Sequence, residues 1–261
     1  MKISKIGTAA DEIARARLSH TPLAPLHPFL RPADEAAAYA VQAALHERLE
    51  PIFGRRVGYK IACTTPVMQQ YLGIHSPCSA GVFANGVHKS GVALRFDDYR
   101  RIGVECEIAV RLGRDIPGGE APFTAEGVRD AVVEYMAAIE LVDDRYVDWR
   151  TTDPPTLIAD DFFAAGCVLG EPVTDPGDPA GLVGTTTING VEVGRGKGRD
   201  VMGHPLNALA WLATSLAGRG RPLRAGEIVL LGSLVETKWL ARADHVVIDI
   251  AGLGRVEMTA G

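Results

Sequence analysis

The sequence lacks several patterns that define other classes of protein. Its four cysteines are scattered, with no C-x-x-C pair and no histidine at a zinc-binding spacing, which argues against a disulfide framework or a structural zinc site. It has no run of about 18 apolar residues that would span a bilayer. The N-terminal residues lead into Asp11 and Glu12 rather than into the apolar part of a signal peptide. We therefore expect a soluble, cytoplasmic protein without a membrane partner.

An excess of positive charge is also missing. The 27 lysines and arginines are outnumbered by 32 aspartates and glutamates, which gives a net charge of −5 and argues against a nucleic-acid partner. With 261 residues, 47% of them hydrophobic, the chain is long enough to bury a core. The 29 glycines and 16 prolines lie below the level that signals disorder, so they predict many turns and short strands.

The hydrophobic pattern predicts an α+β fold. We expect helices over residues 11–18, 33–49, 66–72, 125–139 and 205–216. We expect strands over residues 57–62, 92–95, 104–112, 139–142, 165–169, 185–188, 191–193, 228–231 and 246–250. This order does not make a regular βαβ repeat. It favours a mixed or largely antiparallel sheet, rolled or sandwiched, behind a helical N-terminal segment.

One proline-rich stretch, residues 22–32, is the only strong candidate for a domain boundary. It comes too early to separate two full domains. We therefore expect a helical N-terminal segment, residues 1–56, packed on a catalytic domain of residues 57–261 that forms one functional unit with it.

Three carboxylates stand in apolar surroundings. In the strand 104–112, alternation places Glu105 and Glu107 on one face, about 6–7 Å apart along the chain. Glu140 is the only charge in a run that otherwise looks buried, and a buried carboxylate needs a partner. Three oxygen donors suit Mg²⁺ or Mn²⁺. The alternative is that Glu105 and Glu107 line a solvated face while Glu140 pairs with Arg145 or Arg101.

Blocks of sequence follow one another in a specific order: Gly58–Ala62, Val67–Ile74, Val104–Ala109, Ala138–Arg145, Ile158–Gly170, Met202–Leu206, Ala210–Leu212, Leu223–Val229 and Gly252–Gly254. Together they resemble the 2-keto-4-pentenoate hydratase / 4-oxalocrotonate decarboxylase family of the fumarylacetoacetate hydrolase superfamily, over nearly the whole chain. The resemblance implies a mixed β-roll of the type found in the C-terminal domain of fumarylacetoacetate hydrolase. It also implies one Mg²⁺ or Mn²⁺ ion held by Glu105, Glu107 and Glu140, the three residues that the spacing indicates.

The resemblance gives roles to other residues. Lys60 corresponds to an acid/base or substrate-binding lysine, and beside a cation we expect its pKa to be lowered. Ser233 falls where the family has a hydroxyl-bearing loop near the substrate carboxylate, although a turn would also explain it. Asp160 is a candidate catalytic residue that orients a ligand or Lys60, or else caps a turn. We interpret His204 as a helix-start residue, and the glycine-rich residues 194–198 as a mobile loop whose basic side chains are weak candidates for attracting an anion.

Two departures from the family pattern concern the reaction. Cys78 stands where hydratases of this family usually carry an aspartate, and Asp161 where an asparagine is expected, with Ala164 at a commonly polar position. These departures put hydratase activity in doubt and leave the metal chemistry intact.

The resulting hypothesis is a divalent-metal-dependent lyase that hydrates a 2-hydroxy-2,4-dienoate to a 4-hydroxy-2-oxo acid in aromatic-compound catabolism. Alternatives are a decarboxylase of 4-oxalocrotonate-like 2-oxo dicarboxylates and a superfamily hydrolase that cleaves a C–C bond. A non-enzymatic alternative is a structural partner subunit of a hydratase/decarboxylase complex. The expected ligand is a small 2-oxo acid, and the resemblance implies a homo-oligomer that also associates with a related hydratase or decarboxylase.

Overall fold

The computed structural model describes residues 2–261, without the side chains of residues 2–4 and 120. Its α-helices are α1 (Lys2–Leu18), α2 (Glu35–Phe53), α3 (Pro66–Leu72), α4 (Ala125–Arg129), α5 (Pro154–Ala159) and α6 (Pro205–Gly218). Its strands are β1 (Arg56–Ala62), β2 (Cys78–Phe83), β3 (Val87–Lys89), β4 (Val92–Leu94), β5 (Ile102–Leu112), β6 (Val132–Asp143), β7 (Ala164–Leu169), β8 (Val183–Ile188), β9 (Val191–Lys197), β10 (Ile228–Trp239), β11 (His245–Ile250) and β12 (Gly254–Ala260).

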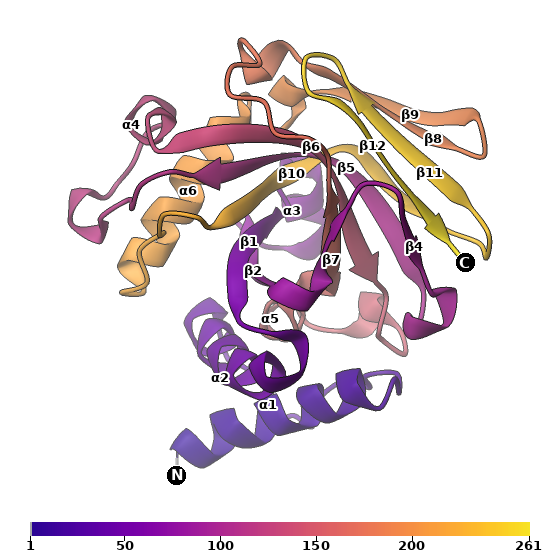
Figure 1. The fold of residues 1–261 in the computed structure, drawn as a ribbon. Helices are drawn as coiled ribbons and strands as arrows, with labels where there is room; N and C mark the ends of the chain where they lie inside the picture. Colours follow the sequence, from indigo (N-terminus) through magenta and orange to yellow (C-terminus); the bar gives the residue numbers. More distant parts are fainter. Residues whose placement is uncertain (1) are drawn as a thin grey trace.

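Two sheets form the body of the molecule (Figure 1). The larger has the strand order β2-β1-β10-β5-β6-β7-β3, and the smaller has the order β4-β12-β11-β8-β9. Both are mixed, because β1 runs parallel to β10, β3 parallel to β7 and β4 parallel to β12, whereas the other pairs are antiparallel. The predicted α+β fold with a rolled or sandwiched mixed sheet is thus present.

The main hydrophobic core lies between the two sheets and α6. It contains alternate residues of β5, such as Ile108, together with Ile248 of β11 and Leu209 of α6, all fully buried. The same alternation turns Glu105 and Glu107 to the opposite face of β5. Burial of the apolar face of β5 therefore fixes which way the two glutamates point.

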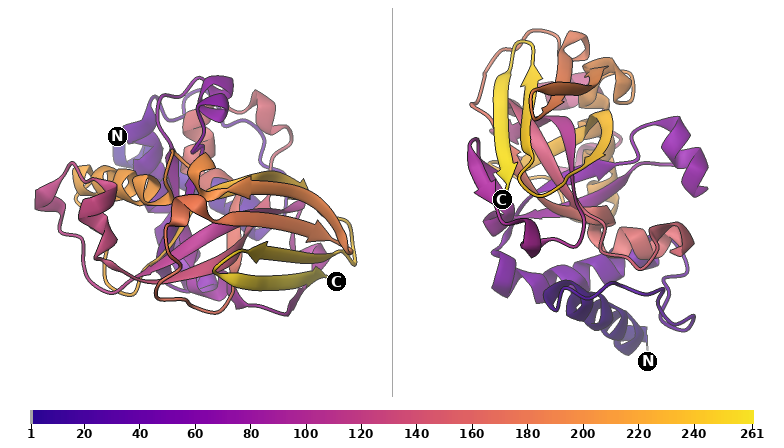
Figure 2. Two further views of the ribbon diagram at one scale, coloured as in Figure 1. Left: turned by 90° about the horizontal axis from the view of Figure 1, so that it is seen from above. Right: turned by 90° about the vertical axis from the view of Figure 1, so that its right-hand side faces the viewer.

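Helices α1 and α2 lie together at one end of the molecule, away from the smaller sheet (Figures 1 and 2). Asp34 begins α2 by accepting a hydrogen bond from the backbone N–H of Ala37. Both helices share a second hydrophobic cluster with residues of α5, of the turn after it and of the β1–β2 region, such as Leu157, Phe162 and Cys63. The boundary at residue 56 stays a prediction.

Three sequence predictions were wrong in detail. The segment 125–139 is not one helix: α4 ends at Arg129, and β6 runs from Val132 to Asp143. Most of β6 is buried on both faces, so it lacks the alternation that marks a strand. The glycine-rich residues 194–198 lie mostly in β9, where a Cβ on Gly196 would come within 1.8 Å of the Leu234 carbonyl oxygen. The first helix begins at Lys2 rather than at residue 11.

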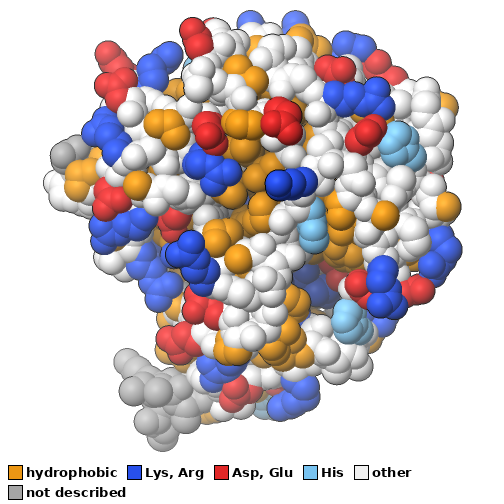
Figure 3. Space-filling view, viewed as in Figure 1, with side chains coloured by type: hydrophobic (Ala, Val, Ile, Leu, Met, Phe, Trp, Pro, Cys, Tyr) orange, Lys and Arg blue, Asp and Glu red, His pale blue; other side chains and the backbone are white. Residues whose placement is uncertain are grey.

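Charged side chains of both signs are mixed with hydrophobic ones over the face shown in Figure 3. Within residues 2–261, no helix is both long and apolar enough to cross a bilayer.

Candidate active site

The three predicted carboxylates come together on the central strands of the larger sheet. Glu105 and Glu107 are two residues apart on β5, and Glu140 on β6 lies directly opposite Glu105 in the strand register. One carboxylate oxygen from each of the three side chains lies within 4.8 Å of the others. Like charges at opposite cross-strand positions repel, so this arrangement needs a compensating positive charge.

The oxygens of this cluster are short of hydrogen-bond donors. Glu107 Oε2 accepts from the backbone N–H of Gly232 at 2.9 Å, and the Thr237 hydroxyl donates to Glu105 Oε1. Glu107 Oε1 and both oxygens of Glu140 are buried without any hydrogen-bond partner. Buried acceptors are almost always satisfied in folded proteins. Unsatisfied carboxylate oxygens that converge in this way fit a hard divalent cation such as Mg²⁺ or Mn²⁺.

Burial and mutual repulsion control the charge of the cluster. Burial, with the nearby charge of Glu140, raises the pKa of Glu105 to about 7, although Lys60 and Thr237 oppose the rise. Burial and the charges of Glu140 and Glu105 also hold the pKa of Glu107 well above its usual range. Both shifts show that the protein alone stabilises three adjacent carboxylates poorly.

Lys60 supplies the nearest positive charge. Its Nζ lies 2.9 Å from Glu140 Oε1, although the geometry is that of an ion pair and not of a hydrogen bond. Burial alone would lower the pKa of this ammonium, but attraction to Glu140, Glu105 and Glu107 outweighs it and raises the pKa. The lowered pKa expected for Lys60 beside a bound cation stays a prediction, because this rise reflects the protein groups without the cation.

Glycine is required at position 232 for two reasons. Gly232 has φ +120°, and a Cβ there would approach Thr64 Cγ2 at 2.6 Å. It lies where the pairing of β10 with β5 shifts register between Leu230 and Ser233. This irregularity aims the Gly232 N–H at Glu107 instead of at a strand neighbour, a common use of bulges beside functional sites.

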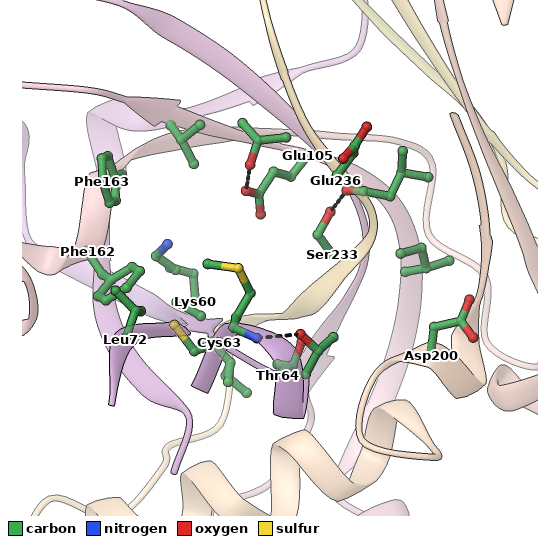
Figure 4. Close-up of a pocket in the computed structure, with 18 of the residues that line it drawn as sticks. Lys60, Cys63, Thr64, Leu72, Glu105, Phe162, Phe163, Asp200, Ser233 and Glu236 are labelled. Atoms are coloured by element: carbon green, nitrogen blue, oxygen red, sulfur yellow. Dashed lines mark hydrogen bonds between the residues drawn. The ribbon is translucent and has the colours of Figure 1, made fainter. Parts of the chain in front are cut away.

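A cavity of about 380 Å³ opens beside the cluster. Its polar inner part is formed by Lys60, Glu105 and Thr237, and Figure 4 shows Lys60 and Glu105 projecting into the space. Much of the remaining wall is apolar and comes from α3, the end of β6, the segment between β6 and β7, and β10: Met68, Leu72, Val142, Trp149, Phe162, Phe163, Leu234, Val235 and Trp239. Asp200 and Glu236 add acidic groups on the side away from Phe162 and Phe163.

The phenylalanines belong to an unusual turn. Asp161, Phe162 and Phe163 have φ values of 58°, 44° and 66°, three consecutive non-glycine residues in the left-handed region. Each such residue costs about 1–3 kcal/mol and persists only where its surroundings enforce it. This turn places Phe162 with its ring centroid 5.7 Å from Lys60 Nζ.

The other predicted residues lie in different places. Ser233 lines the cavity, where its hydroxyl donates to the Val235 carbonyl oxygen at 2.5 Å. Asp160 is buried outside the cavity lining and pairs with Arg145 at 3.2 Å. His204 begins α6, as predicted, by accepting a hydrogen bond from the Leu206 N–H. Arg145 is thus the partner of Asp160 and not of Glu140.

Sequence reasoning missed several residues of the site. Nothing in the sequence around Thr237 indicates a role in the site, because only strand pairing brings Thr237 to Glu105. Gly232 could have been suspected, since a glycine inside a strand pattern suggests a bulge. Phe162 and Phe163 looked like ordinary core residues. Arg101, the second suggested partner of Glu140, instead lies 3.6 Å from Asp144.

Comparisons with known proteins agree with this geometry. Residues 84–260 match the family model described as fumarylacetoacetate (FAA) hydrolase C-terminal. The chain belongs to this family. It is 36% identical to "TodF product hydratase" of Pseudomonas putida over 95% of this chain and 92% of that protein. It is 33% identical to "2-keto-4-pentenoate hydratase" of Burkholderia vietnamiensis over 98% and 97% of the two chains.

A solved structure supports the same fold. The 4-oxalocrotonate decarboxylase from Pseudomonas putida G7, complexed with magnesium and adipate, superposes with a TM-score of 0.93. It is 23% identical and covers 99% of this chain and 98% of its own. The predicted family and α+β fold are confirmed. The relatives named as hydratases also support the prediction of an enzyme of the hydro-lyase type.

Proposed function

We propose that the protein is a divalent-metal-dependent hydratase that converts a 2-hydroxy-2,4-dienoate into a 4-hydroxy-2-oxo acid. The observation that carries the proposal is the convergence of the Glu105, Glu107 and Glu140 carboxylates beside a buried lysine, with buried unsatisfied oxygens on Glu107 and Glu140. The names of the full-length relatives support the same reaction.

The carboxylates and the lysine would have different roles in this reaction. Glu105, Glu107 and Glu140 would hold Mg²⁺ or Mn²⁺, which when bound supplies electrostatic stabilisation to negative charge developing on the oxygens of a 2-oxo acid. Lys60 Nζ holds a proton at the inner end of the cavity. It is placed to protonate the dienol carbon chain, giving the unsaturated ketone to which water adds at C4.

Other residues position the substrate. Ser233 can turn its hydroxyl from the Val235 carbonyl toward the substrate carboxylate, and its place in the cavity lining supports this role. Asp160 remains a candidate only for an indirect role, which its burial against Arg145 supports. The apolar wall excludes bulk water from the carbon chain of the substrate.

The charge of the cavity favours a substrate with a neutral tail. Lys60 is the only lysine or arginine among the lining residues that the structure describes, and it already faces the carboxylate cluster. A 2-oxo dicarboxylate would place its second carboxylate near Asp200 or Glu236, or against the aromatic wall. Each position is unfavourable for an unpaired anion. This observation ranks the hydratase above the decarboxylase alternative.

Two parallel assays test the proposal. Purified protein with Mg²⁺ is given 2-hydroxypenta-2,4-dienoate and, separately, 4-oxalocrotonate. We expect loss of the dienoate absorbance without CO₂ from the first substrate and little reaction with the second. CO₂ release from 4-oxalocrotonate as the faster reaction would favour the decarboxylase. No reaction with either would favour the hydrolase or the structural subunit.

We keep the homo-oligomer as part of the proposal, on the basis of the family resemblance. Light scattering tests it, and a monomer would contradict it. Mixing the chain with a related decarboxylase in the same instrument tests the proposed association.

A further inference from the structure

The left-handed turn that carries Phe162 and Phe163 is held from outside the cavity. Asp161, at its start, is fully buried and does not line the cavity. Its neighbours Phe162 and Phe163 do, and they form one side wall (Figure 4). The backbone that turns these two rings inward is therefore fixed by groups behind the wall.

The Asp161 carboxylate accepts hydrogen bonds from three different elements. Oδ1 accepts from His46 Nε2 of α2 at 2.7 Å and from the Gly81 N–H of β2 at 3.0 Å. Oδ2 accepts from Arg17 of α1 at 3.1 Å. These donors hold the pKa of Asp161 well below its usual range although burial opposes this, so the carboxylate is charged and its bonds are charge-assisted.

Arg17 connects the two ends of the turn. Besides Asp161, its guanidinium donates to the Ala164 carbonyl oxygen at 3.1 Å. The two phenylalanines lie between these contacts. From the other side, Arg145 donates to the carbonyl oxygens of Phe163, at 3.3 Å, and Ala164, at 2.9 Å. A planar guanidinium suits such two-point contacts better than an ammonium does.

We propose that Asp161 is a positioning residue that acts through Arg17 and His46 to set the Phe162–Phe163 wall against which the substrate tail packs. This inference rests on the proposed function, because it takes the cavity as the substrate site. Helices α1 and α2 thereby shape the site although, among their residues whose side chains the structure describes, none lines the cavity. Asparagine at position 161 would keep an acceptor for Gly81 but lose the ion pair with Arg17.

The variants Asp161→Asn and Arg17→Gln test the proposal, singly and together. We expect the KM for 2-hydroxyhexa-2,4-dienoate to rise about tenfold in each single variant, with kcat changed less than about twofold, since a displaced wall weakens binding while Lys60 stays in place. The double variant should lose less affinity than the sum of the two single losses, because both single variants remove the Asp161–Arg17 ion pair. Asp115→Asn is the matched control, since Asp115 pairs with Arg224 at an exposed position.

A binding measurement separates this inference from the proposed reaction. Calorimetry with 2-oxohexanoate and Mg²⁺ needs no turnover, because this saturated acid cannot add water. The same loss of affinity in both single variants would support the positioning role even if the wild type proved not to be a hydratase. Unchanged affinity and KM in folded variants, with only a lower unfolding temperature, would overturn it. Arg17→Lys, which keeps the charge, should give a smaller loss and covers the case in which Asp161→Asn does not fold.

Discussion

Glu105 of β5 and Glu140 of β6 lie directly opposite each other on neighbouring strands, in a position where most proteins place apolar or oppositely charged pairs. Glu107 adds a third carboxylate, and Lys60 supplies a single positive charge at 2.9 Å from Glu140. A lone lysine does not neutralise three carboxylates. A divalent cation would complete the balance, and this is the central claim about the site.

Removing one of the carboxylates should separate metal binding from folding. We expect Glu105→Gln to leave the metal-free protein as stable as the wild type or more stable, because a like-charge contact is lost. Mg²⁺ should then no longer raise the unfolding temperature, whereas for the wild type a concentration of 100 Kd adds about 2.7 kcal/mol. Thermal unfolding with EDTA and with Mg²⁺ measures both effects.

Glu134→Gln is the matched control for this variant. Glu134 also lies on β6, where it pairs with Arg111 at 2.7 Å outside the cluster. It should keep the response of the wild type to Mg²⁺. An equal Mg²⁺-dependent rise in the Glu105→Gln variant would count against the metal site.

Lys60→Met tests the role of the buried lysine. Loss of a group that transfers protons typically lowers kcat about 10²–10⁴-fold, and we expect a fall in this range with Mg²⁺ affinity retained. Lys89→Met, at an exposed position on β3, should behave like the wild type. Near-normal turnover by Lys60→Met would assign the proton transfer to another group.

Much of this site was predictable from the residue pattern. The alternation in 104–112 correctly predicts that Glu105 and Glu107 share a face, and the isolation of Glu140 marks it as needing a partner. That partner was not predictable, because Lys60 reaches Glu140 only through the sheet order β1-β10-β5-β6. The local residue pattern predicts which face of a strand a side chain occupies, but it does not predict which strands lie beside that strand.

The main error in the fold has a similar cause. Most of β6 is enclosed on both sides, so its sequence shows no alternation of apolar and polar residues and resembles the continuation of a helix. The left-handed turn after Asp160 was also beyond sequence reasoning. Its conformation depends on Arg17 and His46, which are more than 100 residues away in the sequence.

Gly232→Ala should damage folding and metal binding together. Its φ of +120° and the 2.6 Å approach to Thr64 Cγ2 mean that the backbone must move, and the N–H bound to Glu107 moves with it. We expect the free energy of unfolding to fall by about 1–3 kcal/mol and Mg²⁺ affinity to fall as well, measured by urea unfolding and calorimetry.

Two further variants isolate the cause. Gly226 also has a positive φ, but the Cβ added in Gly226→Ala would meet no atom within 4 Å. It should lose stability without losing Mg²⁺ affinity. Adding Thr64→Ala to Gly232→Ala should restore part of both losses, and no recovery would show that the clash is not the cause.

Lowering the pH should reduce the free energy of unfolding, in part because Asp161 becomes protonated. His46, Arg17 and the Gly81 N–H hold the pKa of this buried carboxylate well below its usual range, against the opposing effect of burial. A pKa lowered by folding adds stability above the unfolded-state value of about 3.9, and this stability is lost as the pH falls toward the folded-state value. Asp161→Asn should therefore lose less stability than the wild type between pH 6 and pH 3 in urea unfolding, and equal losses would contradict this account.

The most direct test of the central claim is anomalous diffraction from crystals grown with Mn²⁺. We predict one strong anomalous peak within bonding distance of Glu105, Glu107 and Glu140, and its absence from crystals of Glu105→Gln. A Mn²⁺-containing crystal with no peak at these carboxylates, or with its only peak elsewhere, would contradict the assignment of the cluster as a metal site.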